Sequence, residues 1–121
     1  MHLYRIISEE EWLQTIHDKK VPRCNSDKRE DCVHLTNYED LEQVASKYFV
    51  KEEKPVVLKI DSKSFEEKIS WGDPTNEKPW HQPNANIDHI DWNYIIGYSY
   101  LIPLNGKENE FSIGAFLNRE L

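Results

Sequence analysis

The sequence predicts a single α+β domain over residues 1–121, because strand-like and helix-like segments occur together in a chain of modest length. The strand-like segments are short and rich in β-branched or aromatic side chains: residues 2–7, 32–35 and 55–60. The helix-like segments carry a capping signal followed by apolar residues at helical spacing: residues 8–18 and 36–49. A chain of 121 residues supplies one hydrophobic core but is too small for two.

The first segment, HLYRII over residues 2–7, predicts a strand that feeds a capped helix. Ser8 and Glu11 have the spacing of a capping box, in which the hydroxyl caps the helix and the carboxylate reaches back. The apolar residues that follow share one helical face: Trp12, Leu13 and Ile16. The helix is expected to run to about Asp18, and residues 20–31 are expected to form a polar connector.

The second segment, CVHLTNYEDLEQVASKYF, predicts a buried strand over Cys32–Leu35 and a helix that Thr36 caps, with Glu39 completing the box. The helix has an apolar stripe: Leu41, Val44, Ala45, Tyr48 and Phe49. The next segment, PVVLKI over residues 55–60, is short, β-branched and nearly continuous, which favours a central strand.

The C-terminal half predicts shorter elements around one long loop. A helical turn over 64–69 and a short strand at 70–71 precede residues 72–86, which hold Gly, Pro and Asn and are expected to form a structured loop of the kind that covers binding sites. Residues 90–104 predict a long strand, or two with a bulge near Gly97. A last strand over 110–117 is expected after the Asn105-Gly106 turn.

The charge balance restricts the partners. Fifteen basic against 22 acidic residues leave a net charge of −7, which argues against non-specific nucleic-acid binding. No apolar run approaches the roughly 20 residues of a membrane span, and the N-terminus has no signal region, so we expect a cytoplasmic location and no membrane partner. Two cysteines do not make a disulfide scaffold, so both are expected to be reduced.

Common catalytic motifs are absent from the sequence. It has no Gly-rich phosphate loop, no Gly-x-Ser-x-Gly elbow and no Cys-x-x-Cys. The groups that could be considered as metal ligands lack the necessary spacing: Cys24, Cys32 and His34, and His81, Asp88 and His89. We therefore expect no metal site, and we interpret Cys32 as a small core residue beside Val33.

Two strand positions stand out as candidates for ligand binding. Alternation places Arg5 on the face opposite Tyr4 and Ile6, where it suits a bidentate contact to a phosphate; an ion pair with one of the many acids is an equal alternative. His34 and Thr36 share a strand face at the start of the following helix, whose N-terminus favours an anion such as pyrophosphate. The alternatives are a hydrogen-bonded buried His34 and a Thr36 that only caps the helix.

The long loop supplies the remaining candidates, Trp80 and His81. The indole could stack on a base or on a nicotinamide ring. A loop anchored by one buried aromatic is the simpler alternative.

Several segments together resemble a small bacterial family, domain of unknown function 952. CVHLTNYEDLEQVASKYF is similar to the most recognisable segment of this family, a strand with a central His, then Ser or Thr two residues on, and an amphipathic helix. The flanking segments resemble the family in the same order: LYRIISEEEW, PVVLKID, ISWGDP and IIGYSYLIPL.

The resemblance implies a fold related to the ADP-ribosyltransferase-like superfamily: two small packed mixed or antiparallel sheets, split like an opened barrel, with two main helices and a cleft for NAD. The catalytic roles would fall to Arg5, His34 and His81, and the binding of NAD, as substrate, to Arg5, Thr36, Asn37 and Trp80. The sequence departs from the family in having Arg5 where members carry His. Its third motif, PWHQPNANIDHI, is interrupted, and Asp88 and Asp91 are the acids nearest to the missing catalytic Glu.

The leading hypothesis is therefore a protein that binds NAD or a related ADP-ribose nucleotide, and that either transfers ADP-ribose or cleaves NAD. A non-catalytic ligand-binding module is the second hypothesis, and a protein-interaction domain is the third. Under the first, Arg5→Ala and His34→Ala should abolish NAD binding with little change in melting temperature.

Overall fold

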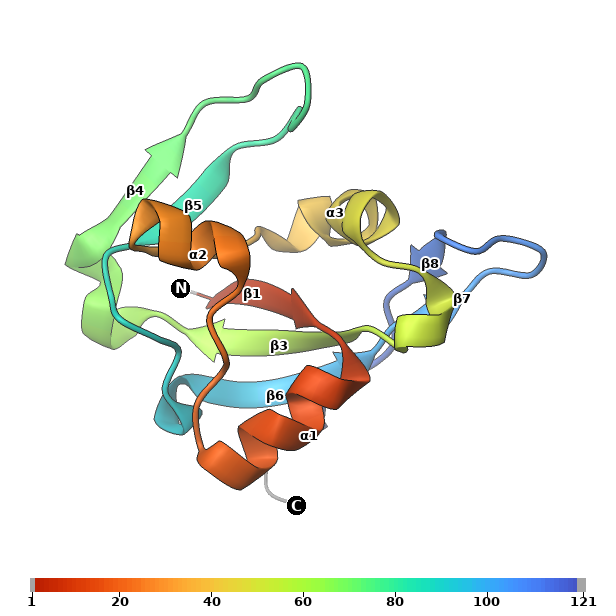
Figure 1. Ribbon diagram of the computed structural model, residues 1–121, viewed down its shortest axis with the longest axis horizontal. Helices are drawn as coiled ribbons and strands as arrows, with labels where there is room; N and C mark the ends of the chain where they lie inside the picture. The colour runs from red at the N-terminus through yellow and green to blue at the C-terminus, as the bar shows by residue number, and fades with distance from the viewer. Residues whose placement is uncertain (1, 120–121) are drawn as a thin grey trace.

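The computed structural model describes residues 2–119. The helices are α1 (Glu9–Asp18), α2 (Asn25–Glu30) and α3 (Leu41–Tyr48), with 3-10 turns η1 (Tyr38–Asp40), η2 (Lys51–Glu53), η3 (Lys63–Lys68) and η4 (Trp92–Tyr94). The strands are β1 (His2–Ile7), β2 (Val33–His34), β3 (Val56–Asp61), β4 (Ile69–Gly72), β5 (Gln82–Ala85), β6 (Ile95–Tyr100), β7 (Ile102–Pro103), β8 (Phe111–Ser112) and β9 (Leu117–Asn118) (Figure 1).

These strands form antiparallel sheets. The largest has the order β1-β3-β6-β9, a second has the order β2-β5-β4, and β7 and β8 form a small ribbon. The predicted α+β class with antiparallel sheets is confirmed. Within residues 2–119, no helix has both the length and the apolar composition needed to cross a bilayer.

The strand β3 lies at the centre of the larger sheet, as its apolar run predicted. It pairs with β1 on one side and β6 on the other, and Val56, Val57 and Leu58 are fully buried. The register with β6 shifts between Lys59, which faces Gly97, and Ile60, which faces Ile95, so the predicted bulge near Gly97 is confirmed. Gly97 is needed there because a Cβ atom would lie 3.0 Å from the main-chain oxygen of Leu117 on β9.

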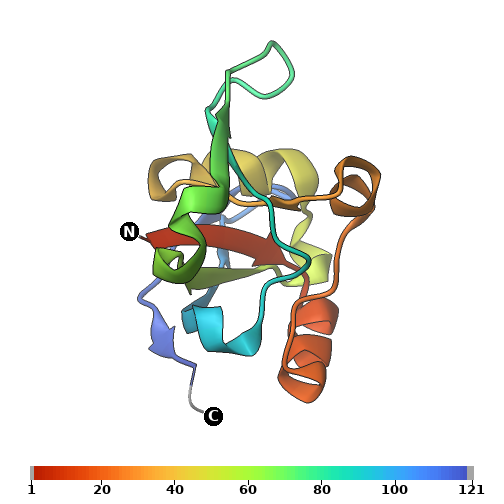
Figure 2. The same ribbon diagram turned by 90° about the vertical axis from the view of Figure 1, so that its left-hand side faces the viewer.

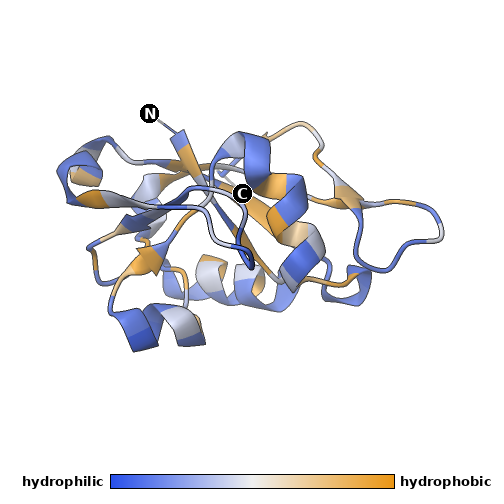
Figure 3. Ribbon diagram, turned by 90° about the horizontal axis from the view of Figure 1, so that it is seen from above, coloured by the Kyte–Doolittle hydropathy of each residue, from blue (hydrophilic) through white to orange (hydrophobic). Residues whose placement is uncertain are grey.

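The two faces of the larger sheet pack against different partners. Leu3 and Ile7 of β1 belong to the core that also holds Trp12 of α1 and residues of the second sheet. Tyr4 and Ile6, on the opposite face, pack with α3 (Figure 2). Apolar residues are concentrated on the central strands, while the projecting loops are mostly polar (Figure 3). Arg5 shares the face of Leu3 and Ile7 by alternation, so it points toward the second sheet.

The two sheets are joined by the segment that contains β2. The Leu35 N–H donates to the carbonyl of Pro83 in β5 at 2.9 Å, whereas Thr36 pairs with Tyr4 of β1 through two main-chain hydrogen bonds of 2.9 and 2.7 Å. The chain therefore leaves the second sheet at Leu35 and joins the first at Thr36. Beside this crossing the sheets diverge, and a pocket opens there.

Several sequence-based predictions about elements were wrong. The expected last strand over 110–117 is two short strands, β8 and β9, which belong to different sheets. Residues 25–30 of the expected connector form α2, and residues 82–85 of the expected loop form β5. The polar sequence NSDKRE has no apolar period, and QPNA contains Pro and Asn, which normally argue against a strand. Thr36 does not cap α3, which begins at Leu41 after η1; its backbone pairs with Tyr4 instead.

The prediction of the buried face of α1 is also only partly correct. Trp12 is buried, but Leu13 is 59% exposed, because the helix packs through a narrow face that includes Thr15. The capping box is confirmed: the Glu11 N–H donates to Ser8 Oγ at 3.2 Å, and the Ser8 N–H donates to Glu11 Oε1 at 3.0 Å.

We predict that Ser8→Ala lowers the free energy of unfolding by about 1 kcal/mol, because the N-terminus of α1 loses its hydroxyl acceptor. Urea titration followed by circular dichroism measures the change. Ser64→Ala, at an exposed position in η3, serves as the control and should change it by less than about 0.5 kcal/mol. Equal effects for the two variants would contradict the assigned cap.

Candidate functional site

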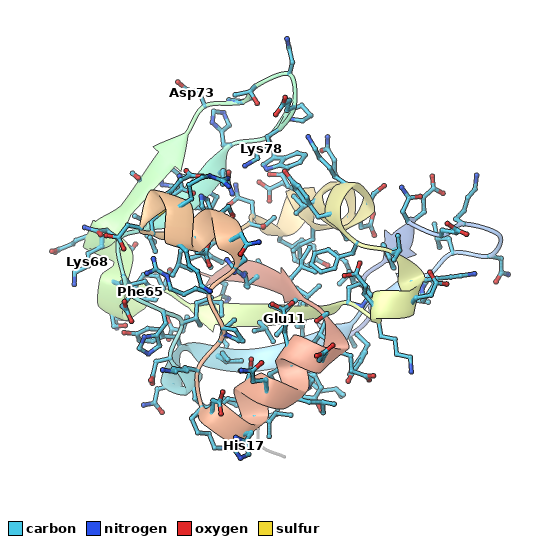
Figure 4. The ribbon with its side chains drawn as sticks, in the orientation of Figure 1. Glu11, His17, Phe65, Lys68, Asp73 and Lys78 are labelled. Atoms are coloured by element: carbon cyan, nitrogen blue, oxygen red, sulfur yellow. The ribbon has the colours of Figure 1, made fainter. Side chains whose placement is uncertain are left out.

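A pocket of about 470 Å³ lies where the two sheets diverge. Its walls come from β1, the first turn of α1, α2, the segment 34–36, the last turn of α3 and the loop that precedes β5. Figure 4 labels Lys78 on that loop and Glu11 on α1, and both residues line the pocket. A wide hollow of about 620 Å³ near Asp61 and Tyr94 is separate and holds none of the buried titratable groups described below.

An ion pair between Arg5 of β1 and Asp27 of α2 lies in the pocket wall. The guanidinium contacts both carboxylate oxygens, with Nη2 at 2.7 Å from Oδ2 and Nη1 at 3.3 Å from Oδ1. The two side chains are only 8% and 2% exposed. Arg5 therefore makes the bidentate contact that its chemistry favours, but its partner is an acid of this chain.

The same two side chains satisfy the main chain of His34. The His34 N–H donates to Asp27 Oδ1 at 3.1 Å, and its carbonyl accepts a hydrogen bond from Arg5 Nη1 at 2.7 Å. These groups lie on the edge of β2 that faces away from β5, where the sheets have separated. An unpaired buried peptide group costs about as much as a lost hydrogen bond, so Arg5 and Asp27 take the place of a neighbouring strand.

The His34 side chain is held between two acids. Its Nδ1 lies 2.7 Å from Asp27 Oδ1, and its Nε2 lies 3.3 Å from Glu30 Oε1. The hydrogen bond to Asp27, followed by the one to Cys24, raises the pKa of His34 to about 9 despite burial, and Glu30 adds to this. Burial alone would raise the pKa of Asp27, but the hydrogen bonds from His34 and Arg5 outweigh it, and the pKa falls below its usual range. At neutral pH the network therefore holds two cations around one buried carboxylate.

Cys24 lies at the open side of this network and lines the pocket. Its Sγ lies 3.2 Å from Ser26 Oγ, and its Sγ, a carboxylate oxygen of Asp27 and a ring nitrogen of His34 all lie within 4.8 Å of one another. Cys32 lies on the other side of the imidazole, with Sγ 3.9 Å from His34 Nε2, and is half-buried rather than a core residue.

The grouping of a thiol, a carboxylate and an imidazole raises the question of a metal ion. Asp27 already accepts two hydrogen bonds from Arg5, and His34 Nδ1 is bonded to the same carboxylate. A divalent cation would have to displace these contacts and would then lie beside the buried guanidinium charge. We therefore assign an ion-pair network and no metal centre.

The structure brings four of the predicted site residues to one pocket: Arg5, His34, Thr36 and Trp80. Two others lie elsewhere. His81 is exposed, Asn37 precedes η1, and neither is among the residues that line the pocket. The last turn of α3, with Val44 and Tyr48, faces the pocket in place of the expected helix N-terminus. Trp80 is only 6% exposed and has Lys47 Nζ at 5.8 Å from its ring centroid, so it mainly anchors the loop.

The residues that sequence reasoning missed are those of α2 and of the loop that precedes β5: Cys24, Asp27, Arg29 and Lys78. Asp27 is one of 22 acidic residues, and its position in a polar segment gives no local sign of burial. A charged residue is almost never buried without a partner. Once Arg5 is placed on an inward strand face, a partner acid is therefore required, but its identity depends on the tertiary fold.

Comparison with known proteins identifies the family. The profile described as "Protein of unknown function (DUF952)" matches residues 6–88, which is more than half of the chain. The chain belongs to the DUF952 family. The matched range contains Cys24, Asp27 and His34 of the network, while Arg5 immediately precedes it.

Solved structures show that the DUF952 chain shares its fold with protein CC0527 from Caulobacter crescentus. The crystal structure of that protein matches with a TM-score of 0.75 and 17% identity over 93% of this chain and 94% of that chain. The solution NMR structure matches with a TM-score of 0.68 and 18% identity over 87% and 89% of the two chains. At this identity the likeness concerns the fold alone. No curated protein matches the chain.

We predict that Arg5→Met lowers the free energy of unfolding by about 3–5 kcal/mol, because it leaves Asp27 buried without its cation. This changes our sequence-based expectation that replacement of Arg5 would leave the melting temperature almost unaffected. Urea denaturation measures the loss. Arg29→Gln, which breaks only an exposed contact of 3.9 Å to Glu30, should cost less than about 1 kcal/mol. A similar cost for both variants would argue against the buried pair.

We also predict a pH-dependent contribution of His34 to stability. The pKa of His34 is about 9 in the folded protein, above its usual value of 6.5, so the stabilisation is complete below pH 6.5 and is lost as the pH rises through 9. The comparison is made in a Cys24→Ser background, between the protein with His34 and its His34→Gln variant. The difference between their unfolding free energies should fall by about 2 kcal/mol from pH 6 to pH 10. The control is His17→Gln, whose contact with Asp18 is exposed and screened by solvent, so that its effect on stability should be small at every pH. A constant difference for His34 would contradict the assigned network.

Proposed function

We propose that this DUF952 protein binds NAD or a related ADP-ribose nucleotide in the pocket between the two sheets. The observation that carries the proposal is the meeting of Arg5, His34, Thr36 and Trp80 at one pocket. These residues were selected from the sequence as nucleotide-binding candidates, and they come from three separate parts of the chain. The volume of about 470 Å³ is within the range usual for small-molecule sites.

The charge around the pocket favours an anionic ligand. Arg29 of α2 and Lys78 of the loop that precedes β5 line the pocket, and His34 adds a positive charge at neutral pH because its pKa is about 9. The lining acids are Glu11, which caps α1 through Ser8, and the exposed Glu77. A cationic pocket is unusual in a chain of net charge −7, and flexible cations on two walls suit a diphosphate between them.

The apolar part of the pocket can take a ring of the nucleotide. Val44, Tyr48, Phe49 and Trp80 lie around it. Because Trp80 is mostly covered, we propose that it offers one apolar wall against which a base or nicotinamide packs. Arg5 supports the site by holding His34, since both of its terminal nitrogens are engaged by Asp27 and by the carbonyl of His34.

The relationship to the ADP-ribosyltransferase-like superfamily is part of the same proposal. It is supported by two antiparallel sheets that share the segment 33–36 and diverge beside it. Cleavage of NAD would pass through an oxocarbenium-like state at the ribose, with an acid that orients the acceptor. Asp88 and Asp91 do not line the pocket, and Glu77 is the lining acid without a capping role. For this reason a binding module without turnover is the second candidate.

We predict that calorimetry will detect ADP-ribose and NAD binding to the wild-type protein, and that Arg29→Gln and Lys78→Gln will each weaken it about tenfold. Lys28→Gln is the matched control, since Lys28 is the neighbour of Arg29 on α2 but does not line the pocket. Affinity should fall as salt concentration rises. No binding at millimolar nucleotide, or equal effects of the Lys28 and Arg29 variants, would refute the proposal.

A second measurement separates the two candidates. Release of nicotinamide from NAD, followed by chromatography, is expected from an enzyme. Binding without release would support the non-catalytic module.

A further inference from the structure

We propose that Cys24 is a nucleophile that forms a covalent bond with the electrophilic carbon of a small molecule in the pocket, with Arg5, Asp27 and His34 beside its sulfur. The proposal goes beyond nucleotide binding and does not depend on it. It assigns a chemical role to a residue that sequence analysis had considered only as an unlikely metal ligand.

The position of Cys24 satisfies the first requirement, which is access. The residue precedes α2, is half-buried, and contributes to the lining of the pocket. Its main-chain N–H donates to Asp27 Oδ2 at 3.4 Å, which ties the residue to the buried ion pair. A molecule bound in the pocket can therefore meet the sulfur of a residue whose backbone is fixed.

The surroundings of Cys24 favour the thiolate. The charged groups that face it are Arg5 from β1, Asp27 from α2 and His34 from β2, and the Ser26 hydroxyl lies 3.2 Å from Sγ. Burial alone would raise the pKa of Cys24, but the hydrogen bonds from His34 and Ser26 and the charge of Arg5 outweigh it and lower the pKa to about 7. About half of the molecules would then carry the reactive thiolate at neutral pH.

Cys32 is an internal control for this environment. Its sulfur is near the same imidazole, at 3.9 Å from Nε2, but it does not line the pocket. Burial, with the acids Glu30 and Asp27, raises the pKa of Cys32. The two thiols near one histidine therefore differ. The hydrogen bonds from His34 and Ser26, with the charge of Arg5, favour the thiolate of Cys24, whereas burial and the nearby acids disfavour that of Cys32.

The reaction step needs only the thiolate, the small molecule and a proton from solvent. A lone pair of the Cys24 thiolate attacks the carbon, a C–S bond forms, and the bond from that carbon to the leaving group breaks. The leaving group departs with its electron pair and, where it is basic, takes a proton from solvent. His34 keeps both ring protons, which Asp27 and Glu30 hold at 2.7 and 3.3 Å, and Asp27 remains ionised. The product is a thioester for an acyl carbon and a thioether for an alkyl carbon.

The test uses iodoacetamide as the electrophile. In a Cys32→Ser variant, Cys24 is the only thiol, and in Cys24→Ser the only thiol is Cys32. We expect the alkylation rate of Cys24 to rise with a midpoint near pH 7 and to exceed that of Cys32 about fivefold at pH 7, since a greater thiolate fraction is offset in part by lower nucleophilicity. A midpoint at the ordinary thiol value of about 8.5, or faster reaction of Cys32, would overturn the proposal.

A second variant tests the role of His34. His34→Gln in the Cys32→Ser background should move the midpoint upward by at least about one pH unit, toward the ordinary thiol value. Circular dichroism establishes whether this variant is folded. For wild-type protein, which needs no substitution, mass spectrometry after brief treatment at pH 7 should locate the first added group on Cys24, and its location on Cys32 would overturn the proposal.

A third test asks whether Zn²⁺ binds at Cys24. Stoichiometric Zn²⁺ should leave the rate of Cys24 alkylation within about twofold, because Arg5 occupies the carboxylate of Asp27. Complete protection by micromolar zinc would instead identify a metal centre and overturn the assignment of a free nucleophile. None of these measurements uses a nucleotide, so failure of NAD binding and failure of this inference are distinguishable.

Discussion

The buried ion pair between Arg5 and Asp27 determines how the pocket can exist. It joins β1 to α2, and together its members bond both main-chain groups of His34 on the open edge of β2. An exposed strand edge beside a ligand pocket would otherwise need a further strand or water to satisfy it. At the edge of β2 the side chains of Arg5 and Asp27 take the place of a further strand. The space that such a strand would fill is left open as the pocket. The pocket is therefore a direct result of how the two sheets separate.

The same pair controls the electrostatics of the wall. Asp27 is a buried anion between the Arg5 guanidinium and the His34 imidazolium, and their charges lower its pKa below the usual range. The Arg5 guanidinium and the His34 imidazolium also lie close to Cys24, where they favour its thiolate. Structural support and chemical activation thus depend on one set of contacts. Replacement of its members changes stability and reactivity together, so activity measurements on such variants require a parallel measurement of folding.

Much of the fold could be predicted from the sequence, and the reasons are local. The β-branched run at 56–60 requires burial on both faces, and Ser8 with Glu11 marks the start of α1 whatever surrounds it. The DUF952 family was recognised from the segment around His34, and the comparison confirmed it. The elements α2 and β5 could not be predicted, because each is stabilised by distant partners: Asp27 by Arg5, and β5 by β2 and β4. The pocket residues divide in the same way. Arg5 was identified by strand alternation, while Asp27 and Cys24 belong to a segment with no periodic signal.

The segment 33–36, which belongs to both sheets, has a consequence for the order of folding. Its partners lie far away along the chain: Thr36 pairs with Tyr4, His34 accepts from Arg5 across 29 residues, and Val33 faces Ala85 of β5. Loops of this length must close before the shared segment is held from both sides, and such non-local contacts form slowly. A partly folded chain in which this segment is not yet held would have neither the pocket nor the charges around Cys24. If Cys24 has the proposed reactivity, that reactivity marks a chain in which both sheets hold the segment 33–36.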